Sequence, residues 1–157
     1  MKNKRFPLFI DLKGRKAVVI GGGPIGLRRA GILRDFGAEV TVISPTLHAP
    51  SDGLCWLEKT YSPNDLTGAY IVIAATNVPD VNAAAGRAAR ALGAFFNRSD
   101  DPSDCDFFFP AICEGEHLLA GVTGDATNHK QVAEAAKRIR TILTGKQQEQ
   151  TYLEEKP

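Results

Sequence analysis

The sequence predicts an α/β fold of the Rossmann type, a doubly wound parallel sheet with helices on both faces. Three observations predict it. An apolar run at residues 17–20 leads into the spacing Gly-x-Gly-x-x-Gly at residues 21–26, which opens into a helical pattern. Strand and helix patterns then alternate along the chain with short connections. The continuous apolar run at residues 69–75 is typical of a parallel strand that is buried on both faces.

The glycine-rich turn has a separate physical role for each of its spaced glycines. Gly21 takes the tight turn off the strand, Gly23 lets the backbone approach a pyrophosphate, and Gly26 lets helix and strand pack closely. Pro24 suits the first helical position, because its φ is already helical and its missing N–H would have had no partner. The free N–H groups and the dipole of the following helix then favour phosphate binding.

The elements that follow are predicted from hydrophobic periodicity and from glycine and proline stops. Apolar residues at helical spacing extend the first helix to Phe36, Gly37 ends it, and residues 39–43 form the next strand. The remaining predicted elements are, in order, a strand at 54–61, a turn or single helical turn at 62–66, the buried strand at 69–75, an alanine-rich helix at 79–92, a strand at 94–96, short extra strands at 107–112 and 117–123, and a C-terminal helix at 131–143.

Length and composition indicate one domain, spanning residues 1–144, followed by a polar tail at 145–157. The chain has 157 residues, 43% of them hydrophobic, and a formal net charge of +1 with both signs scattered. This pattern gives no electrostatic footprint for nucleic acid, and no apolar run is long enough to cross a membrane. Three widely spaced cysteines and the lack of a signal-peptide core predict reduced thiols in a cytoplasmic protein.

Cofactor contacts are expected outside the carboxyl ends of the parallel strands. An acidic residue commonly ends the second strand of NAD-binding folds, but here Ile43 is followed by Ser44-Pro45-Thr46. Neither an acid for the ribose nor an arginine for a 2′-phosphate is present, so this feature leaves NAD and NADP open, and the hydroxyls of Ser44 and Thr46 could bond the ribose. The expected cofactor-binding residues are Gly21, Gly22, Gly23, Pro24, Ile25, Gly26, Ser44, Pro45, Thr46, Thr76 and Asn77.

A second candidate site is the acidic segment at residues 97–106, directly after a predicted strand. Four of the seven residues from Asp100 to Asp106 are aspartates. A carboxylate at the edge of a cofactor site can accept a proton while a hydride leaves the substrate. Asp, Ser and Pro also favour turns for purely local reasons, so composition alone leaves both a catalytic segment and a plain turn open.

Five stretches carry a family likeness: residues 7–14, the turn at 21–26, and residues 73–77, 97–102 and 105–111. In this order they resemble the siroheme synthase family, and specifically its precorrin-2 dehydrogenase and sirohydrochlorin ferrochelatase module. The similarity extends over about residues 7–123, which makes it more specific than the glycine turn alone.

The resemblance implies NAD-dependent oxidation of precorrin-2 to sirohydrochlorin, and in bifunctional members the insertion of ferrous iron to give siroheme. Asp100 falls on the family's catalytic aspartate. In physical terms, Asp100 would accept protons while the nicotinamide takes the hydride. The same match implies cofactor contacts at Pro24, Ile25, Pro45 and Thr46, and tetrapyrrole contacts at Asn97, Arg98 and Thr123.

The chain departs from the family pattern after its last predicted strand. The family shows a Ser-x-Gly-x-Ser-Pro type loop there, whereas this chain has Thr123-Gly124-Asp125-Ala126-Thr127-Asn128. Family members also continue into a helical dimerisation region, of which only one predicted helix and a polar tail are present. The insertion of ferrous iron and the formation of a homodimer are therefore left open.

Several smaller signals leave alternatives. A tetrapyrrole with many carboxylates needs basic partners, and the candidates are Arg28, Arg29, Arg98 and Lys130, although an ordinary solvated helix face explains the first two equally well. No residue is assigned as a metal ligand, because the three histidines are isolated and the cysteines are not closely paired. Two other functions stay open, a non-catalytic NAD-sensing regulatory domain and a chelatase without redox activity. Replacing Asp100 would disable an enzyme and leave a sensor intact.

Overall fold

The computed structural model describes residues 5–50, 53–125 and 127–145, and the chain divides into two compact units. One unit is Phe6–Phe108, and the other contains the chain from Phe109 onward. The predicted boundary between a domain at 1–144 and a tail at 145–157 stays a prediction, because residues 146–157 lie outside the described part of the chain.

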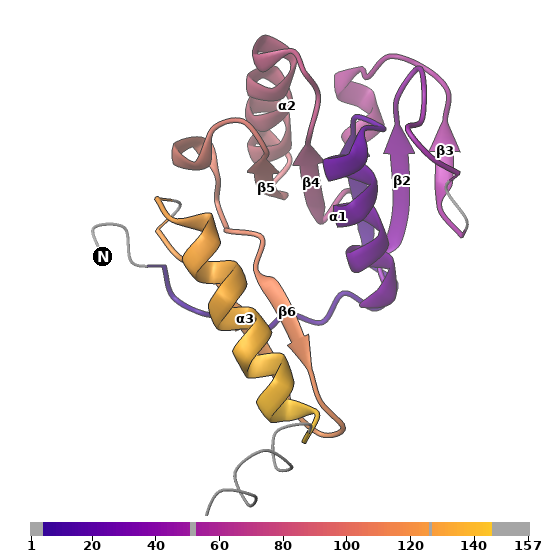
Figure 1. Ribbon diagram of the computed structural model, residues 1–157. Coiled ribbons are helices and arrows are strands. Elements are labelled where there is room, and N and C mark those ends of the chain that lie inside the picture. Colours follow the sequence, from indigo (N-terminus) through magenta and orange to yellow (C-terminus); the bar gives the residue numbers. More distant parts are fainter. Residues whose placement is uncertain (1–4, 51–52, 126, 146–157) are drawn as a thin grey trace, which may run out of the picture. The chain divides into compact units, whose positions relative to one another are not determined.

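A five-stranded parallel sheet forms the centre of the Phe6–Phe108 unit (Figure 1). Its strand order is β3-β2-β1-β4-β5, and every neighbouring pair is parallel. The order reverses beside β1, which is the arrangement of a doubly wound Rossmann sheet. The predicted fold class is therefore confirmed. The strands are β1 (Lys16–Ile20), β2 (Glu39–Ile43), β3 (Cys55–Leu57), β4 (Ile71–Ala74) and β5 (Phe95–Arg98).

Helices cover both faces of this sheet, because alternate residues of each strand point to opposite sides. On one face, Val18 of β1, Val72 of β4 and Phe96 of β5 pack with Ala85 and Ala89 in a single buried cluster. The two alanines belong to α2 (Pro79–Ala91), and the 3₁₀ helix η1 (Pro63–Leu66) adds Leu66 to the same cluster. On the other face lies α1 (Pro24–Asp35), which packs on β1 and β2.

Two strands differ from the expected boundaries. β3 covers only Cys55–Leu57 of the predicted residues 54–61, because the amide of Lys59 turns back to the Leu57 carbonyl at 2.9 Å and ends the strand. β5 continues two residues beyond the predicted Phe96, and Asn97 and Arg98 pair in register with Ile73 and Ala74. The two polar residues stay in the strand because their buried side chains find partners inside the unit, as described below.

The unit that begins at Phe109 contains an antiparallel pair and one helix. β6 (Ala111–Glu114) and β7 (Leu119–Val122) are joined by a turn in which the Gly115 amide donates to the Leu118 carbonyl at 2.8 Å. α3 (His129–Leu143) begins after Asn128, whose side chain accepts from the Gln131 amide. The helix packs on β6, where the Cys113 thiol donates to the Ala136 carbonyl at 3.4 Å. The predicted strand at 107–112 is found shifted along the chain to 111–114, the one at 117–123 is shortened to 119–122, and the helix begins at His129 and not at 131.

Cys55, Cys105 and Cys113 form no disulfide in the described part of the chain, and the first is exposed and the other two are buried. In the described part of the chain, no helix combines the length and the apolar character that crossing a membrane requires.

Candidate functional site

The candidate cofactor site lies where the strand order reverses, between β1 and its neighbour β4. Ligands of open parallel sheets bind outside the carboxyl ends of the strands at this position. The glycine turn leaves β1 here, and Ala75 and Thr76 follow β4. The Ala75 amide donates to the Ile20 carbonyl at 2.8 Å, which holds the two strand ends together.

Two of the spaced glycines are required by the packing of the turn itself. Gly21 has a φ of +107°, and a Cβ on it would lie 2.5 Å from the Ala75 carbonyl oxygen. A Cβ on Gly26 would collide with the carbonyl oxygen of Gly21, and it would lie 3.5 Å from Val19 Cγ1. The roles predicted for these two glycines, the tight turn and the close packing of helix and strand, agree with this geometry.

Gly22 has a role that the sequence analysis missed. A Cβ on Gly22 would collide with the Thr46 carbonyl oxygen and would lie 2.7 Å from Leu47 Cδ2. The Gly22 carbonyl accepts a hydrogen bond from the His48 amide at 2.8 Å. The loop after β2 therefore lies directly against the glycine turn. The loop begins at Ser44, which is buried, and continues through Pro45 and Thr46, which are exposed.

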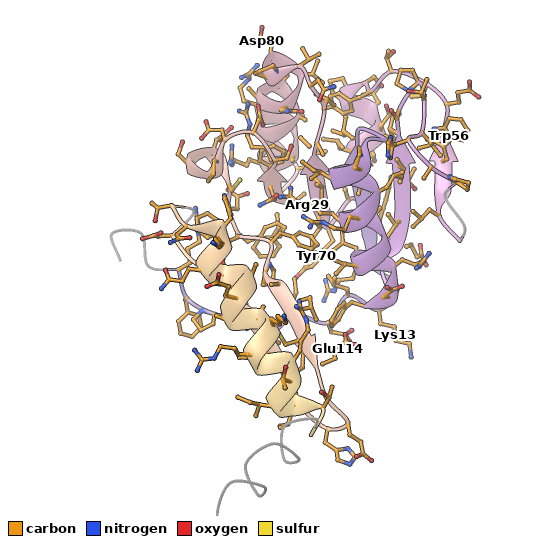
Figure 2. The ribbon with its side chains drawn as sticks, in the orientation of Figure 1. Lys13, Arg29, Trp56, Tyr70, Asp80 and Glu114 are labelled. Atoms are coloured by element: carbon orange, nitrogen blue, oxygen red, sulfur yellow. The ribbon has the colours of Figure 1, made fainter. Side chains whose placement is uncertain are left out.

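The start of this loop is fixed by β3. The Ser44 amide donates to the Leu57 carbonyl at 3.2 Å, and the Ser44 carbonyl accepts from the indole N–H of Trp56 at 2.9 Å. Figure 2 shows Trp56 on this outer strand. Both main-chain groups of Ser44 are thus used within the sheet.

Nothing in the described part of the structure requires a glycine at position 23. Its φ is −76°, and no atom lies within 4 Å of the position of a Cβ. No side chain caps the helix that starts at Pro24, and its first turn carries no acidic residue. Open space over Gly23 and uncapped N–H groups at a helix N-terminus fit the pyrophosphate of a dinucleotide. Ile25, 46% exposed, lies outside the core at the same helix end.

The end of β4 is held by a buried asparagine on α2. Asn82 is 0% exposed, and its Oδ1 accepts from the Thr76 hydroxyl at 2.7 Å and from the Thr76 amide at 3.2 Å. Its Nδ2 donates to the Thr76 carbonyl at 3.1 Å. Asn77, the next predicted cofactor residue, is exposed. Asn82 was missed in the sequence, although its spacing to Ala85, Gly86 and Ala89 places it on the buried stripe of the helix.

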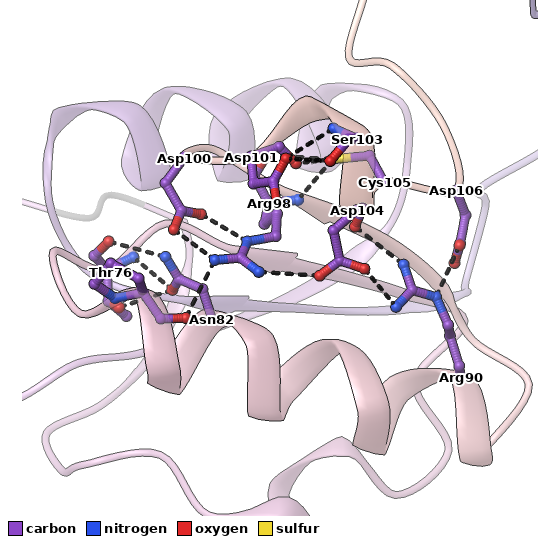
Figure 3. A network of polar contacts seen from close by, with 11 residues as sticks. Thr76, Asn82, Arg90, Arg98, Asp100, Asp101, Ser103, Asp104, Cys105 and Asp106 are labelled. Atoms are coloured by element: carbon purple, nitrogen blue, oxygen red, sulfur yellow. Dashed lines mark hydrogen bonds and ion pairs between the residues drawn. The ribbon is translucent and has the colours of Figure 1, made fainter.

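Arg98 organises the acidic segment (Figure 3). Its guanidinium is 7% exposed and donates to both oxygens of Asp100, at 2.8 and 2.6 Å. It also donates to Asp104 at 3.0 Å and to the Pro79 carbonyl at the start of α2 at 3.2 Å. The hydrogen bonds that Arg98 donates to Asp100, and then to Asp104, raise its pKa despite its burial.

Asp100 is ionised near neutral pH. Hydrogen bonds from Arg98 lower the pKa of its carboxyl group against the effect of burial. Arg98 also donates to the Pro79 carbonyl, so the ion pair joins Asp100 to the start of α2. The preceding residue, Ser99, donates its amide to the Ala74 carbonyl at 3.0 Å, which places the start of the bend at the carboxyl end of β4.

The other three aspartates stabilise the bend. Asp101 accepts from the amide of Ser103 at 3.0 Å and caps the 3₁₀ helix η2 (Pro102–Asp104). Asp104 and Asp106 each accept from Arg90 of α2 at 2.9 Å. Asp106 also accepts from the Phe96 amide at 3.0 Å, so the segment follows the outer edge of β5. The local turn interpretation thus accounts for these three carboxylates, whereas Asp100 is paired with Arg98.

Asn97, which is expected to contact a tetrapyrrole, is 3% exposed. Its side chain makes hydrogen bonds within the Phe6–Phe108 unit. Its Oδ1 accepts from Arg29 of α1 at 2.7 Å, and its Nδ2 donates to the Phe107 carbonyl at 2.7 Å. Arg98 is likewise engaged with Asp100 and Asp104. A direct substrate contact at either residue would have to replace these bonds, and the tetrapyrrole contacts expected at Asn97 and Arg98 stay predictions.

The remaining candidates, Arg28, Thr123 and Lys130, are exposed. Arg28 is exposed on α1, and burial, with the nearby Arg28 charge, lowers the pKa of Arg29. Thr123 and Lys130 are exposed and belong to the unit that starts at Phe109. Over residues 5–50, 53–125 and 127–145, no three His, Cys, Asp or Glu side chains are grouped to hold a metal ion.

Comparisons with known proteins agree with this geometry. The model of a family described as putative NAD(P)-binding matches residues 8–111. The probable multifunctional siroheme biosynthesis protein HemA of Ruminiclostridium josui is 37% identical over 88% of this chain and 28% of its own length. Siroheme synthase of Pseudomonas aeruginosa (strain LESB58) is 40% identical over 76% of this chain and 28% of its own length. The chain thus spans less than a third of the length of these relatives.

A solved structure shares the fold. The protein titled SirC, precorrin-2 dehydrogenase, aligns with a TM-score of 0.72 and 24% identity, over 88% of this chain and 70% of that chain. The family match covers the sheet, the glycine turn and the acidic bend, and the resemblance seen in the sequence is confirmed by relatives that carry siroheme synthase names. The chain therefore belongs to the putative NAD(P)-binding family, and within it is similar to a segment of the siroheme synthases.

Proposed function

We propose that this chain catalyses the NAD-dependent oxidation of precorrin-2 to sirohydrochlorin. One structural observation carries the proposal. The Asp100 carboxylate is held by Arg98, and the preceding Ser99 is bonded to Ala74 at the end of β4, next to β1, whose glycine turn offers room for a dinucleotide. The relatives support the substrate, because they are named for siroheme synthesis. The matched solved structure, which shares the fold, is titled a precorrin-2 dehydrogenase.

The glycine turn and the strand ends would hold the cofactor. The open backbone at Gly23 and the first turn of α1 would bind the pyrophosphate. Pro45 and Thr46, exposed after β2, would face the adenosine ribose, and Thr76 and Asn77 would face the nicotinamide half. When bound, NAD supplies a hydride acceptor.

Asp100 supplies the proton acceptor. Oxidation of the macrocycle removes one hydride and one proton, so two electrons leave with the hydride and the proton needs a base. A macrocycle that has lost a hydride is cationic, and its N–H or C–H proton is acidic. A carboxylate whose pKa is lowered by Arg98 is a weak base, but it is ionised and it stabilises the developing positive charge.

The assay mixes the purified protein with precorrin-2 and NAD and follows the absorbance of NADH and of sirohydrochlorin. The wild type is expected to form both in equal amounts. Asp100→Asn is expected to keep NAD affinity, measured by calorimetry, and to lose turnover by about two to four orders of magnitude. Asp101→Asn is the matched control, because an asparagine can still cap η2 and the neighbouring residue is outside the proposed machinery.

Each other outcome identifies a different function. Full activity of Asp100→Asn would contradict its role as proton acceptor. NAD binding by the wild type without NADH formation would favour the sensing domain, and metal insertion without NAD would favour a chelatase. Repeating the assay with ferrous iron tests whether sirohydrochlorin goes on to siroheme. The homodimer and the cytoplasmic location stay predictions from the sequence.

A further inference from the structure

We propose that Asp104 is the second counter-ion of Arg98 and keeps this buried guanidinium paired when Asp100 takes up a proton. This inference rests on the proposed function, in which Asp100 is the proton acceptor. The geometry that carries it is a guanidinium between two carboxylates, with Asp100 on one side and Asp104 on the other (Figure 3). Because it acts through Arg98, Asp104 is a positioning residue, which keeps the positive charge of Arg98 in place beside Asp100.

Ion pairs of alternating sign connect the acidic bend to α2. Arg98 pairs with Asp100 at 2.6 Å and with Asp104 at 3.0 Å. Arg90 of α2 pairs with Asp104 and with Asp106, each at 2.9 Å. These described residues form one row of three carboxylates and two guanidinium groups, so the row carries one excess negative charge. A proton on Asp100 would leave two charges of each sign.

The contact with Asp104 adds charge to the surroundings of Arg98 and is not what orients its guanidinium. The Nε and Nη2 atoms of Arg98 donate to the two oxygens of Asp100, at 2.8 and 2.6 Å. Nη2 also donates to the Pro79 carbonyl at 3.2 Å. These three contacts fix the plane of the guanidinium, and the bond from Nη1 to Asp104 at 3.0 Å comes in addition.

Burial makes a second counter-ion necessary. The Arg98 side chain is only 7% exposed, and a buried charge that loses its partner strongly destabilises a protein. Protonation of Asp100 removes one of the two carboxylates that pair with this guanidinium. Asp104 stays ionised, because burial raises its pKa but hydrogen bonds from Arg98 and Arg90 outweigh this effect and lower it.

The neighbouring carboxylate of Asp101 does not have this role. It accepts from the amide and the hydroxyl of Ser103, at 3.0 and 2.6 Å. The charged groups around Asp100 are therefore Arg98 from β5, Asp101 next to it in the chain, and Asp104 across the guanidinium. Of the two aspartates, Asp104 is the one that forms an ion pair with Arg98.

A double-mutant cycle tests this pairing without substrate. Asp100→Asn imitates the neutral, protonated carboxyl group. Asp100→Asn and Asp104→Asn each leave one carboxylate beside Arg98, whereas the double variant leaves neither. We expect the melting temperature of the double variant to fall by at least about 5 °C more than the sum of the two single effects. Additive effects would overturn the proposal.

The matched control is Asp35→Asn, because Asp35 also pairs with an arginine, Arg34 at 2.8 Å, but is 63% exposed. Combined with Asp100→Asn, it is expected to give an additive change in melting temperature. If the double variant at Asp100 and Asp104 does not fold, adding Arg98→Met is expected to restore folding, because this change removes the lone buried charge. A triple variant that also fails to fold would contradict the proposal.

The effect on the reaction is measured with precorrin-2 and NAD. Asp104→Asn is expected to lower kcat by at least about tenfold and to change KM for NAD by less than about twofold. In this variant, proton uptake by Asp100 leaves Arg98 without a carboxylate, so the proton is accepted less readily. A purely structural role would not lower the kcat of the folded fraction, which circular dichroism measures at the assay temperature. An unchanged kcat would overturn the role of Asp104.

The two measurements separate this inference from the proposed function. If the wild type forms no NADH but the double-mutant cycle is non-additive, the proposed reaction is wrong and the pairing of Arg98 with Asp104 stands. If the wild type is active and the cycle is additive, only the role of Asp104 is wrong.

Discussion

Gly23 shows how a single residue can report on a ligand. Gly21, Gly22 and Gly26 each face an atom of the protein that a Cβ would meet, whereas the space over Gly23 is open and its φ is one that any residue adopts. The packing of the chain explains three of these glycines and does not explain the fourth, over which we propose that the pyrophosphate lies. The open position coincides with the uncapped end of α1, where an anion is favoured.

Gly23→Ala is therefore expected to weaken NAD binding without harming the fold. A methyl group at this position would occupy the space that the pyrophosphate needs, and we expect NAD affinity to fall by at least about tenfold, or ~1.4 kcal/mol. Without NAD, the melting temperature should change no more than it does for a neutral substitution on the surface. Calorimetry and thermal unfolding measure the two quantities on the same sample.

Gly21→Ala is the comparison variant. Its positive φ and its contact with the Ala75 carbonyl predict a loss of stability as well as of binding. Equal NAD affinity in wild type and Gly23→Ala would place the pyrophosphate elsewhere.

At the scale of elements, α2 is positioned by one close contact with β5. A Cβ on Gly86 of α2 would lie 2.6 Å from Cε1 of the buried Phe96. The helix can approach the strand this closely only because residue 86 has no side chain, and the same helix carries Asn82 and accepts from Arg98 at Pro79. The distance between α2 and β5 thus sets the geometry of the Asp100 network.

Gly86→Ala is expected to destabilise the unit by about 1–3 kcal/mol, the usual cost of overpacking a core. The gain in helix propensity from Gly to Ala, about 1 kcal/mol, offsets only part of it. Gly31→Ala in α1 is the control, because nothing lies within 4 Å of its Cβ position, so this variant should gain up to about 1 kcal/mol. Urea unfolding of both variants tests the difference, and equal stabilities would contradict the close contact.

Most elements of the sheet could be predicted because their signals are local. The apolar runs at β1, β2 and β4, the proline starts of α1 and α2 and the stop at Gly37 each lie within the element they define. β5 was predicted too short, because Asn97 and Arg98 stay in the strand only through partners on distant parts of the chain, Arg29 and Pro79. A periodicity cannot show such partners.

The candidate site was predictable to a similar extent. Gly21, Gly23 and Gly26 follow from their spacing, and Asp100 from the resemblance. The bonds of Arg98 to Asp104 and the role of Asn82 needed the fold, because they join a strand, a bend and a helix. The helical register of Asn82 with Ala85 and Ala89 was the available signal, and an alanine-rich segment gave no reason to look for it.

At the scale of the whole Phe6–Phe108 unit, carboxylates with lowered pKa values lie both in the acidic bend after β5 and on η1. Asp100 and Asp104 lie beyond β5. Burial raises the pKa of Asp104, but hydrogen bonds from Arg98 and Arg90 outweigh it and the net shift is downward. Asp65 on η1 behaves similarly, since hydrogen bonds from Lys59 and Ser62 outweigh its burial. A group whose pKa is lower in the folded state stabilises the fold above its unfolded pKa, about 3.9 for Asp, and loses this contribution as the pH falls.

The unit is therefore expected to lose stability steeply below about pH 4, where these carboxylates take up protons more readily in the unfolded chain. Asp65→Asn isolates one contribution. It removes the charge that pairs with Lys59 at 2.7 Å, so at neutral pH it should be less stable than wild type by about 1 kcal/mol. As the pH falls through the folded pKa of Asp65, the wild type loses the same charge, and the two unfolding free energies should converge.

Asp35→Asn changes an exposed ion pair on α1 and should shift stability by less than about 0.5 kcal/mol at any pH. Urea unfolding over a pH series measures all three proteins, and a difference between wild type and Asp65→Asn that grows on acidification would contradict the direction of the Asp65 shift.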